Sequence, residues 1–155
     1  MEEIGGTMME WVDIMQRKLG FSTESEDTPP QESSIEYKAS DPIKFVSKGW
    51  GYEKWIANCP EYCGKILFIA QGKKCSWHYH QNKDEVFYVQ RGVVEVIYSE
   101  IDNDEVADKI LLCEGDKFHV PRGMRHQMCA LRDTEILEFS TEHRDEDSYR
   151  IKRGD

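Results

Sequence analysis

The sequence lacks any long apolar run and any excess of positive charge. No stretch of about 18 apolar residues occurs in its 155 residues, so we expect no transmembrane helix. Asp and Glu number 30 against 20 Lys and Arg, which gives a formal net charge of −10. Because nucleic acid and anionic membranes bind basic surfaces, this charge balance argues against both as partners.

The chain also lacks a cysteine framework and a targeting segment. Its five cysteines are odd in number and have no regular spacing, which is typical of free thiols in a reducing compartment. The N-terminal residues, MEEIGGTMMEWV, do not contain a basic region followed by an apolar core, as a secretion signal does. We therefore expect a cytoplasmic protein. No internal repeat is evident, and the length fits one domain.

The first third of the chain is polar and divides into two segments. Residues 1–21 contain an apolar stripe at helical spacing, formed by Met8, Trp11, Val12, Met15 and Leu19. Thr7 and Glu10 form a capping-box pattern, and Gly20 is placed to end a helix. We predict a short amphipathic helix that packs on the chain's own barrel or on a dimer mate, or that docks another protein. Residues 22–40 are acidic and rich in Ser and Pro, which predicts a flexible linker.

The rest of the chain, residues 41–155, consists of short apolar runs separated by turn residues. The runs span residues 43–46, 64–70, 76–80, 85–90, 93–98, 109–112, 117–120, 127–131 and 135–140. Short strands at regular intervals, with Gly and Pro between them, predict an all-β sandwich or barrel.

Three histidines and one glutamate in this region have the spacing of metal ligands. His78 and His80 are two residues apart, so in a strand both side chains project from one face. Glu85 begins the next predicted strand, and His126 follows a second Gly-containing stretch. Three imidazoles and one carboxylate suit one divalent transition-metal ion such as Zn, Mn, Fe, Ni or Co. The alternative is a barrel that has lost its metal or uses it only for stability.

The two motifs resemble those of the cupin superfamily. The first cupin motif is matched by Gly72, His78, His80, Glu85 and Gly92, and the second by Gly115, Pro121, Gly123 and His126. Ala130 stands where the second motif usually has Asn, a position that is not a ligand. The resemblance covers residues 41–150. It implies an all-β fold, a single cupin barrel (a double-stranded β-helix or jelly-roll), preceded here by a short N-terminal helix.

Two flanking segments narrow the resemblance. Residues 48–55 (KGWGYEKW) resemble the opening strand of the cupin domain in type II mannose-6-phosphate isomerases, and residues 137–150 resemble its closing segment. His78 is a departure, because many of those isomerases have Gln there. In this respect the chain is similar to D-lyxose isomerase-like sugar cupins. The resemblance implies a metal-dependent isomerase or epimerase that acts on a sugar or sugar phosphate through a metal-stabilised enediolate.

Such an enzyme needs a base and groups that hold the substrate. Lys65 and Glu138 occupy strand positions that could face inward, and both are candidate proton-transfer residues. Each could instead face solvent. Arg122, Arg125 and Arg150 are candidates for binding substrate hydroxyls or a phosphate through forked donors, and surface ion pairing is the alternative for each.

Strand alternation places the neighbours of the predicted ligands. With His78 inward, Trp77 and Tyr79 should point to the other face of the sheet. His119 is predicted to be a hydrogen-bonded strand residue, although a pocket role is open. His143 follows the last predicted strand and is expected at the surface.

Two other functions fit the same motifs. An Fe-dependent cupin dioxygenase also uses three histidines with open coordination positions, and a sugar-binding or regulatory cupin needs no catalysis. In each case the partner is a small molecule. Because an open sheet edge needs cover, we also expect a homodimer with residues 43–55 near its interface.

Overall fold

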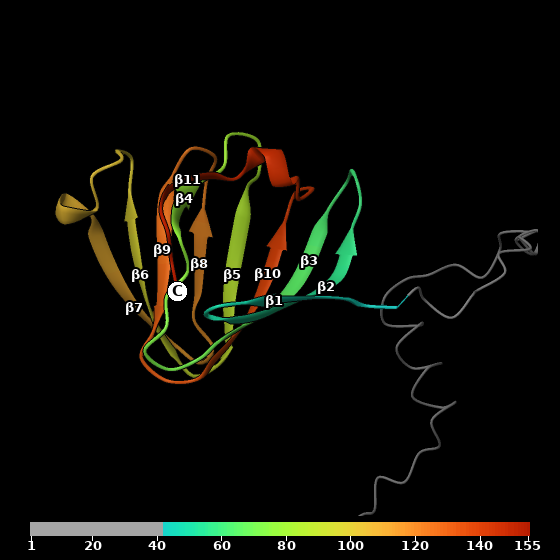
Figure 1. The fold of residues 1–155 in the computed structure, drawn as a ribbon, viewed down its shortest axis with the longest axis horizontal. Helices are drawn as coiled ribbons and strands as arrows, with labels where there is room; N and C mark the ends of the chain where they lie inside the picture. Colours follow the sequence, from blue (N-terminus) through green and yellow to red (C-terminus); the bar gives the residue numbers. More distant parts are fainter. Residues whose placement is uncertain (1–41) are drawn as a thin grey trace, which may run out of the picture. The chain divides into compact units, whose positions relative to one another are not determined.

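The computed structural model describes residues 42–155, and the structural statements below concern these residues. They form eleven strands in two antiparallel sheets that face each other, with two short 3₁₀ helices in the connections (Figure 1). The predicted N-terminal helix and acidic linker lie outside the described residues. No helix within residues 42–155 is long and apolar enough to cross a membrane.

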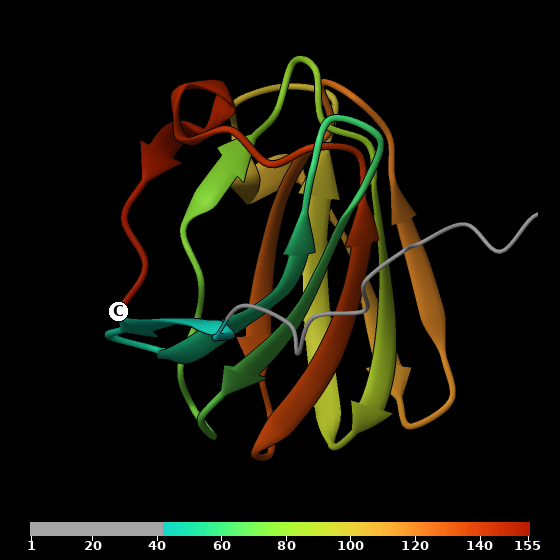
Figure 2. The same cartoon turned by 90° about the vertical axis from the view of Figure 1, so that its right-hand side faces the viewer.

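The larger sheet has six strands in the order β1-β2-β3-β10-β5-β8 (Figure 2). These strands are β1 (Lys44–Lys48), β2 (Gly51–Asn58), β3 (Cys63–Ile69), β10 (Thr134–Ser140), β5 (Glu85–Arg91) and β8 (Lys117–Val120). The strand β10 lies between β3 and β5, so a strand from the C-terminal part of the sequence lies in the middle of this sheet.

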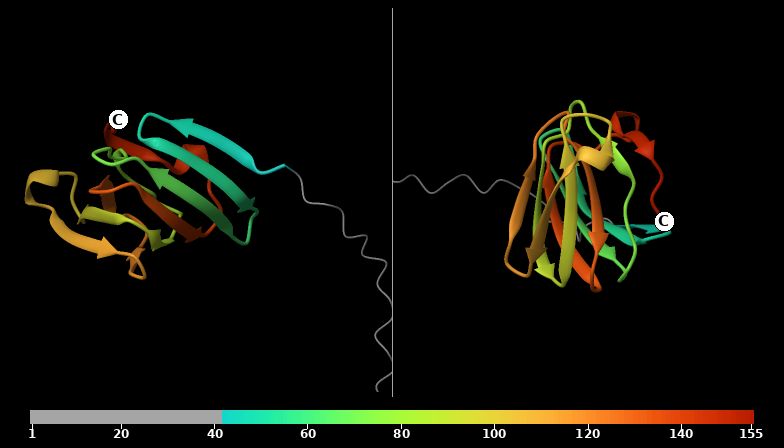
Figure 3. Two further views of the ribbon diagram at one scale, coloured as in Figure 1. Left: turned by 90° about the horizontal axis from the view of Figure 1, so that it is seen from below. Right: turned by 90° about the vertical axis from the view of Figure 1, so that its left-hand side faces the viewer.

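The smaller sheet has five strands in the order β11-β4-β9-β6-β7 (Figure 3). They are β11 (Tyr149–Lys152), β4 (Trp77–Tyr79), β9 (Arg125–Ala130), β6 (Val93–Ser99) and β7 (Asp108–Cys113). The 3₁₀ helix η1 (Asp104–Val106) lies in the connection between β6 and β7, and η2 (Asp145–Asp147) lies between β10 and β11.

The predicted all-β fold is confirmed, and the nine predicted runs all overlap observed strands. Strand β11 was not predicted, because its sequence YRIK is only four residues long and mostly exposed. It forms through pairing with β4, where Arg150 lies opposite His78. Trp77 does face away from His78, as alternation requires, yet it is fully buried, and its indole Nε1 donates to the backbone oxygen of Asp102 at 2.9 Å.

The inward-facing side of the sheets changes character along the strands. Along β3 the inward residues are Lys65, then Leu67 and Ile69, and along β10 they are Glu138, then Ile136. The other strands repeat the pattern, with Glu85 before Phe87 on β5 and His126 before Met128 on β9. One end of the barrel is therefore a packed apolar core, and the other end carries buried polar groups.

The backbone requires glycine at two motif positions. Gly123 lies at the polar end of the barrel, and Gly92 lies in the turn at the other end. Gly92, between β5 and β6, has φ of 99°, and a Cβ there would lie 2.4 Å from the backbone oxygen of Asp133. Gly123 has φ of 82° and donates its N–H to the carbonyl of His80 at 2.7 Å. Such φ values are strained for other residues. Gly123 thus joins the two motifs directly, because it ties the turn before His126 to the strand that carries His80.

Candidate metal centre and its cavity

Three imidazoles meet at the polar end of the barrel. His78 lies on β4 and His80 directly follows it, while His126 lies on β9 and pairs with His78 across the strands. The ring centroids of His78 and His126 are 4.4 Å apart. The candidate ligand atoms of the three residues all lie within 4.8 Å of one another. This geometry suits a shared divalent ion, as the spacing predicts.

Backbone carbonyls orient all three rings. In each ring Nδ1 lies within hydrogen-bonding distance of one carbonyl oxygen: His78 to Ser76 at 2.9 Å, His80 to Asp147 at 2.8 Å and His126 to Met124 at 3.2 Å. A carbonyl can only accept, so Nδ1 carries the hydrogen and Nε2 keeps its lone pair. A hydrogen-bonded second nitrogen is typical of metal-binding histidines.

The rings are neutral because they are buried. Burial lowers the pKa of His80 and His126, and burial together with neighbouring His126 lowers the pKa of His78 to about 3. Neutral imidazole is the form that binds metal ions.

Glu85 completes the set with one oxygen that has no partner. Its Oε1 accepts from Nζ of Lys83 at 2.5 Å. Its Oε2 lies 3.3 Å from Nε2 of His126 and 3.7 Å from Nε2 of His80. Among the buried side-chain atoms of residues 42–155, Oε2 is the one without a hydrogen bond. Burial by itself raises the pKa of Glu85, but the charge of Lys83 outweighs it and holds the pKa below its ordinary value.

An anionic oxygen without a donor, beside three nitrogen lone pairs, is unfavourable unless a cation sits among them. The four residues therefore fit a divalent transition-metal ion. A metal cofactor at the His triad is supported, and the identity of the ion is left open by the ligand types.

Lys83 was not recognised from the sequence. Its side chain is 2% exposed, and its Nζ contacts both Glu85 and Glu138. Burial by itself lowers the pKa of Lys83, but these two carboxylates outweigh it and raise the pKa. Lys83 is two residues before Glu85 but lies in the loop ahead of β5, so strand alternation by itself did not place its side chain.

The loop that carries Lys83 is held by Asp147 of η2. The Asp147 carboxylate accepts the backbone N–H groups of Gln81, Asn82 and Lys83 at 2.9–3.1 Å. Burial by itself raises the pKa of Asp147, but these hydrogen bonds keep it below the ordinary value. The backbone oxygen of the same residue orients His80, so η2 supports the site at two points.

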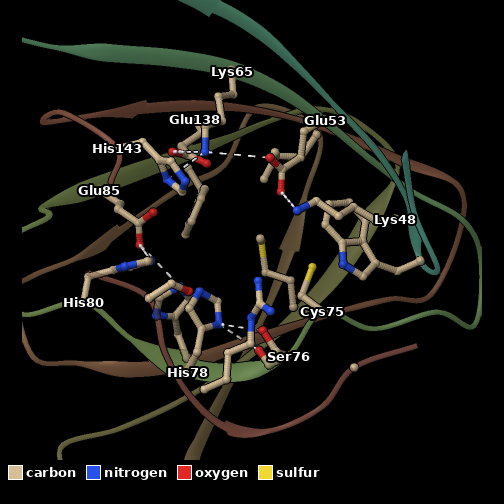
Figure 4. A pocket seen from close by; sticks show the side chains of 18 of the residues that line it. Lys48, Glu53, Lys65, Cys75, Ser76, His78, His80, Glu85, Glu138 and His143 are labelled. Atoms are coloured by element: carbon tan, nitrogen blue, oxygen red, sulfur yellow. Dashed lines mark hydrogen bonds and ion pairs between the residues drawn. The ribbon is translucent and has the colours of Figure 1, made fainter. Parts of the chain in front are cut away.

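A second buried cluster surrounds Lys65. The side chain of Lys65 is 2% exposed. Its Nζ lies 3.8 Å from one carboxylate oxygen of Glu138 and 3.8 Å from one of Glu53. The same Nζ is 3.0 Å from Nδ1 of His143 (Figure 4). It also lies 4.3 Å from the centroid of the Trp55 ring. Lys65 and Glu138 thus both face inward, next to the metal ligands.

The prediction that His143 lies at the surface is wrong. Its side chain is 12% exposed and lines the cavity. The connection after β10 folds back, and the side chain of Asn58 on β2 holds both the backbone N–H and the backbone carbonyl of His143, at 2.8 and 3.0 Å. Burial and the nearby Lys65 lower the pKa of His143. A single histidine after a predicted strand gives no local sign of this long-range contact with Asn58.

The predicted arginines do not all reach the cavity. Arg150 lines it, but Arg122 and Arg125 do not. Arg122 donates from Nε to the backbone oxygen of Asn82 at 2.6 Å. Arg125 donates from Nε to Asp102 at 2.7 Å and lies over the ring of Tyr79 on β4.

His119 forms a hydrogen bond with the carboxylate of Asp84 at 2.9 Å, which agrees with its predicted role.

These groups share one cavity of about 270 Å³. Five basic residues line it, namely Lys48, Lys65, Lys83, Arg150 and Arg153. Five acidic residues do so as well, namely Glu53, Glu85, Glu138, Asp145 and Asp155. These charges are balanced although the whole chain is acidic, so a bound divalent cation would make the cavity positive.

Comparison with known proteins agrees with the architecture. Residues 66–141 match the family "Cupin domain". This match, together with the fold, supports a cupin domain in this part of the chain. Among curated proteins none matches the sequence.

Several solved structures resemble this chain in fold. The structure of KdgF from Halomonas sp. is 25% identical, with a TM-score of 0.54, over 61% of this chain and 81% of that one. The capsular polysaccharide assembling protein CapF from Staphylococcus aureus is 20% identical, with a TM-score of 0.63, over 73% and 33%. A variant of oxalate decarboxylase from Bacillus subtilis is 17% identical, with a TM-score of 0.60, over 70% and 30%. The matched part thus spans about a third of the last two proteins, whose likeness shows the fold.

Proposed function

We propose that the cavity is the active site of a metal-dependent isomerase or epimerase that acts on a sugar or a sugar phosphate. One observation carries the proposal: a set of metal ligands lies beside a separate buried cluster of proton-transfer groups in the same polar cavity. Glu138 and Lys65, both buried, form that cluster with His143. An aldose–ketose isomerase needs both parts, because the carbonyl must be polarised while a proton moves between adjacent carbons.

Glu138 is the base in this proposal. Its contacts with Lys83, Lys65 and Ser140 all involve Oε1. Oε2 has no hydrogen bond with the described residues, so it can accept a substrate proton. A bound divalent ion would act as a Lewis acid on the carbonyl and neighbouring oxygens of the open-chain sugar. Lys65 has three N–H donors and is placed to bind the substrate oxygen nearest Glu138 or to return a proton.

The charges of the cavity favour a ligand rich in hydroxyl groups, with or without a phosphate, over an apolar one. Arg150 lies at the exposed rim and is placed to bind such an outer group. Arg122 and Arg125 have no part in the proposal, because neither lines the cavity. The neighbours in fold do not choose the substrate, because cupin barrels serve many functions.

The test is solvent-deuterium exchange. Metal-loaded protein is incubated in deuterated buffer with pentoses, hexoses and their phosphates, and deuterium at C1 or C2 is followed by NMR. We expect incorporation with at least one sugar, and loss of about 10²–10⁴-fold in Glu138→Gln. The control is Glu135→Gln, the same change on the outer face of β10.

Three other outcomes would replace the proposal. Oxygen consumption with Fe(II) and no exchange would identify a dioxygenase. Sugar binding without exchange would identify a binding protein. Exchange that is unchanged in Glu138→Gln would keep the reaction class but remove Glu138 as the base.

A further inference from the structure

Lys83 is the buried group whose role the metal ligands and the base do not explain. It lies in the loop between β4 and β5, and its side chain is 2% exposed. The ammonium group contacts Oε1 of Glu85 at 2.5 Å and also contacts Oε1 of Glu138. A buried ammonium is costly unless it is paired, and here it is paired with one metal ligand and with the proposed base.

We propose that Lys83 is a positioning residue that reserves one oxygen of Glu85, so that Glu85 offers a bound ion Oε2 alone and coordination positions stay open toward the cavity. The inference rests on the metal site of the proposed function and not on its sugar chemistry.

The two oxygens of Glu85 are already divided between two tasks. Oε2 points to Nε2 of His126 and of His80, at 3.3 and 3.7 Å, and has no hydrogen bond. Oε1 is engaged by Lys83. A carboxylate can give an ion one oxygen or two. An ammonium on one oxygen opposes the second mode, because the ion and the ammonium carry the same sign and would compete for that oxygen.

Lys83 cannot readily leave this position. Its backbone N–H donates to Oδ2 of Asp147 at 2.9 Å, which fixes the loop at the base of the side chain. Its charge is shared by two buried carboxylates, so movement would leave Glu85 without its lysine partner and Glu138 with Lys65 at 3.8 Å. The same contacts fix the distance between the metal ligand Glu85 and the base Glu138.

On a six-coordinate ion, the binding mode of Glu85 would set the number of coordination positions left open. Three imidazoles and one oxygen of Glu85 leave about two positions for water or substrate, whereas a two-oxygen Glu85 leaves about one. An aldose or ketose that binds through two adjacent oxygens needs both positions. Lys83 therefore acts on specificity through Glu85, without touching the substrate's reacting atoms.

The test counts exchangeable water on protein loaded with one Mn²⁺, through the relaxation of water protons. The variant is Lys83→Met with Glu138→Gln, which removes one positive and one negative charge together. The matched control is Glu138→Gln alone, which keeps the contact between Lys83 and Glu85. We expect wild type and the control to give equal relaxation, and the double variant to give roughly half of it.

Equal relaxation in all three proteins would overturn the inference, and so would a wild type that binds no Mn²⁺. Should the double variant fail to fold, wild type alone is decisive. With ¹³C-labelled glutamate, the infrared difference between metal-loaded and metal-free protein reports the ligating carboxylate. A wide separation of its two stretching bands shows one-oxygen binding and supports the role of Lys83, whereas a narrow separation shows two-oxygen binding and refutes it. Neither measurement uses a sugar, so a failed isomerase assay would leave the inference standing.

Discussion

Glu85→Gln separates the two roles of the carboxylate, as an ion-pair partner and as a metal ligand. The change keeps the shape of the side chain but removes its charge. In metal-free protein the loss should be moderate, because Lys83 keeps its contact with Glu138 and the amide oxygen can still accept from Lys83. We expect a decrease of about 1–3 kcal/mol in the free energy of unfolding.

The response to metal should change much more. A ligand that binds only the folded state at 100 times its dissociation constant stabilises by about 2.7 kcal/mol. For a domain of roughly 100 residues this raises the melting temperature by about 10 °C or more. Glu85→Gln loses the only anionic member of the ligand set, so at the same ion concentration we expect a shift of less than about 3 °C.

The assay is thermal unfolding by circular dichroism after removal of metal by a chelator and titration with Zn²⁺ or Mn²⁺. Glu135→Gln, on the outer face of the same sheet, should keep the full shift. A full shift in Glu85→Gln would remove Glu85 from the ligand set. No shift in wild type with any divalent transition metal would refute the metal site itself.

Three further predictions concern the loop, the histidines and assembly. Asp147→Ala should lower the free energy of unfolding by about 3 kcal/mol in urea titrations at pH 7, because three backbone N–H groups lose their acceptor. Since the backbone hydrogen bonds hold the pKa of Asp147 below its ordinary value of 3.8, its contribution is present above that value and is lost as pH falls through the folded pKa. Wild type and variant should therefore converge in stability as the pH falls through the folded pKa, and a constant difference would contradict this account. Metal affinity measured by isothermal titration should stay nearly constant from pH 8 to about pH 6, because burial lowers the pKa of all three histidines; a steep fall near pH 6.5 would show ordinary histidines. Phe45 and Phe139 are 59% and 57% exposed on the outer face of the larger sheet, so Phe139→Asp should convert the predicted homodimer to a monomer in light scattering, whereas a monomeric wild type would exclude the dimer.

The candidate metal ligands could be proposed from the sequence because their placement depends on local rules. Two histidines at i and i+2 share a face of any strand, and a glutamate that begins the next strand lies beside them. Lys83 lies in the loop before β5, where strand alternation does not apply, and its local sequence does not distinguish it from an exposed lysine. The inward orientation of Glu138 needed the register of β10 between β3 and β5, which pairs residues far apart in the chain.

Other features could not be derived from local patterns. His143 is drawn into the cavity by Asn58, 85 residues away in the sequence, and Arg122 and Arg125 are turned outward by partners on other loops. Strand β11 is only four residues long and mostly exposed, and it forms through its pairing with β4. Each of these outcomes depends on a contact between distant segments, which spacing along the chain does not contain.

The sequence by itself therefore determined the all-β class, the cupin motifs and the four candidate ligands, because strand alternation and turn glycines act over a few residues. Only the tertiary structure decided which charged groups are buried together. It placed Lys83 between Glu85 and Glu138, and Lys65 beside His143, because both sheets and the returning end of the chain bring their polar ends to one cavity. Burial of charge depends on every neighbour at once, and those neighbours come from strands that are remote in the sequence.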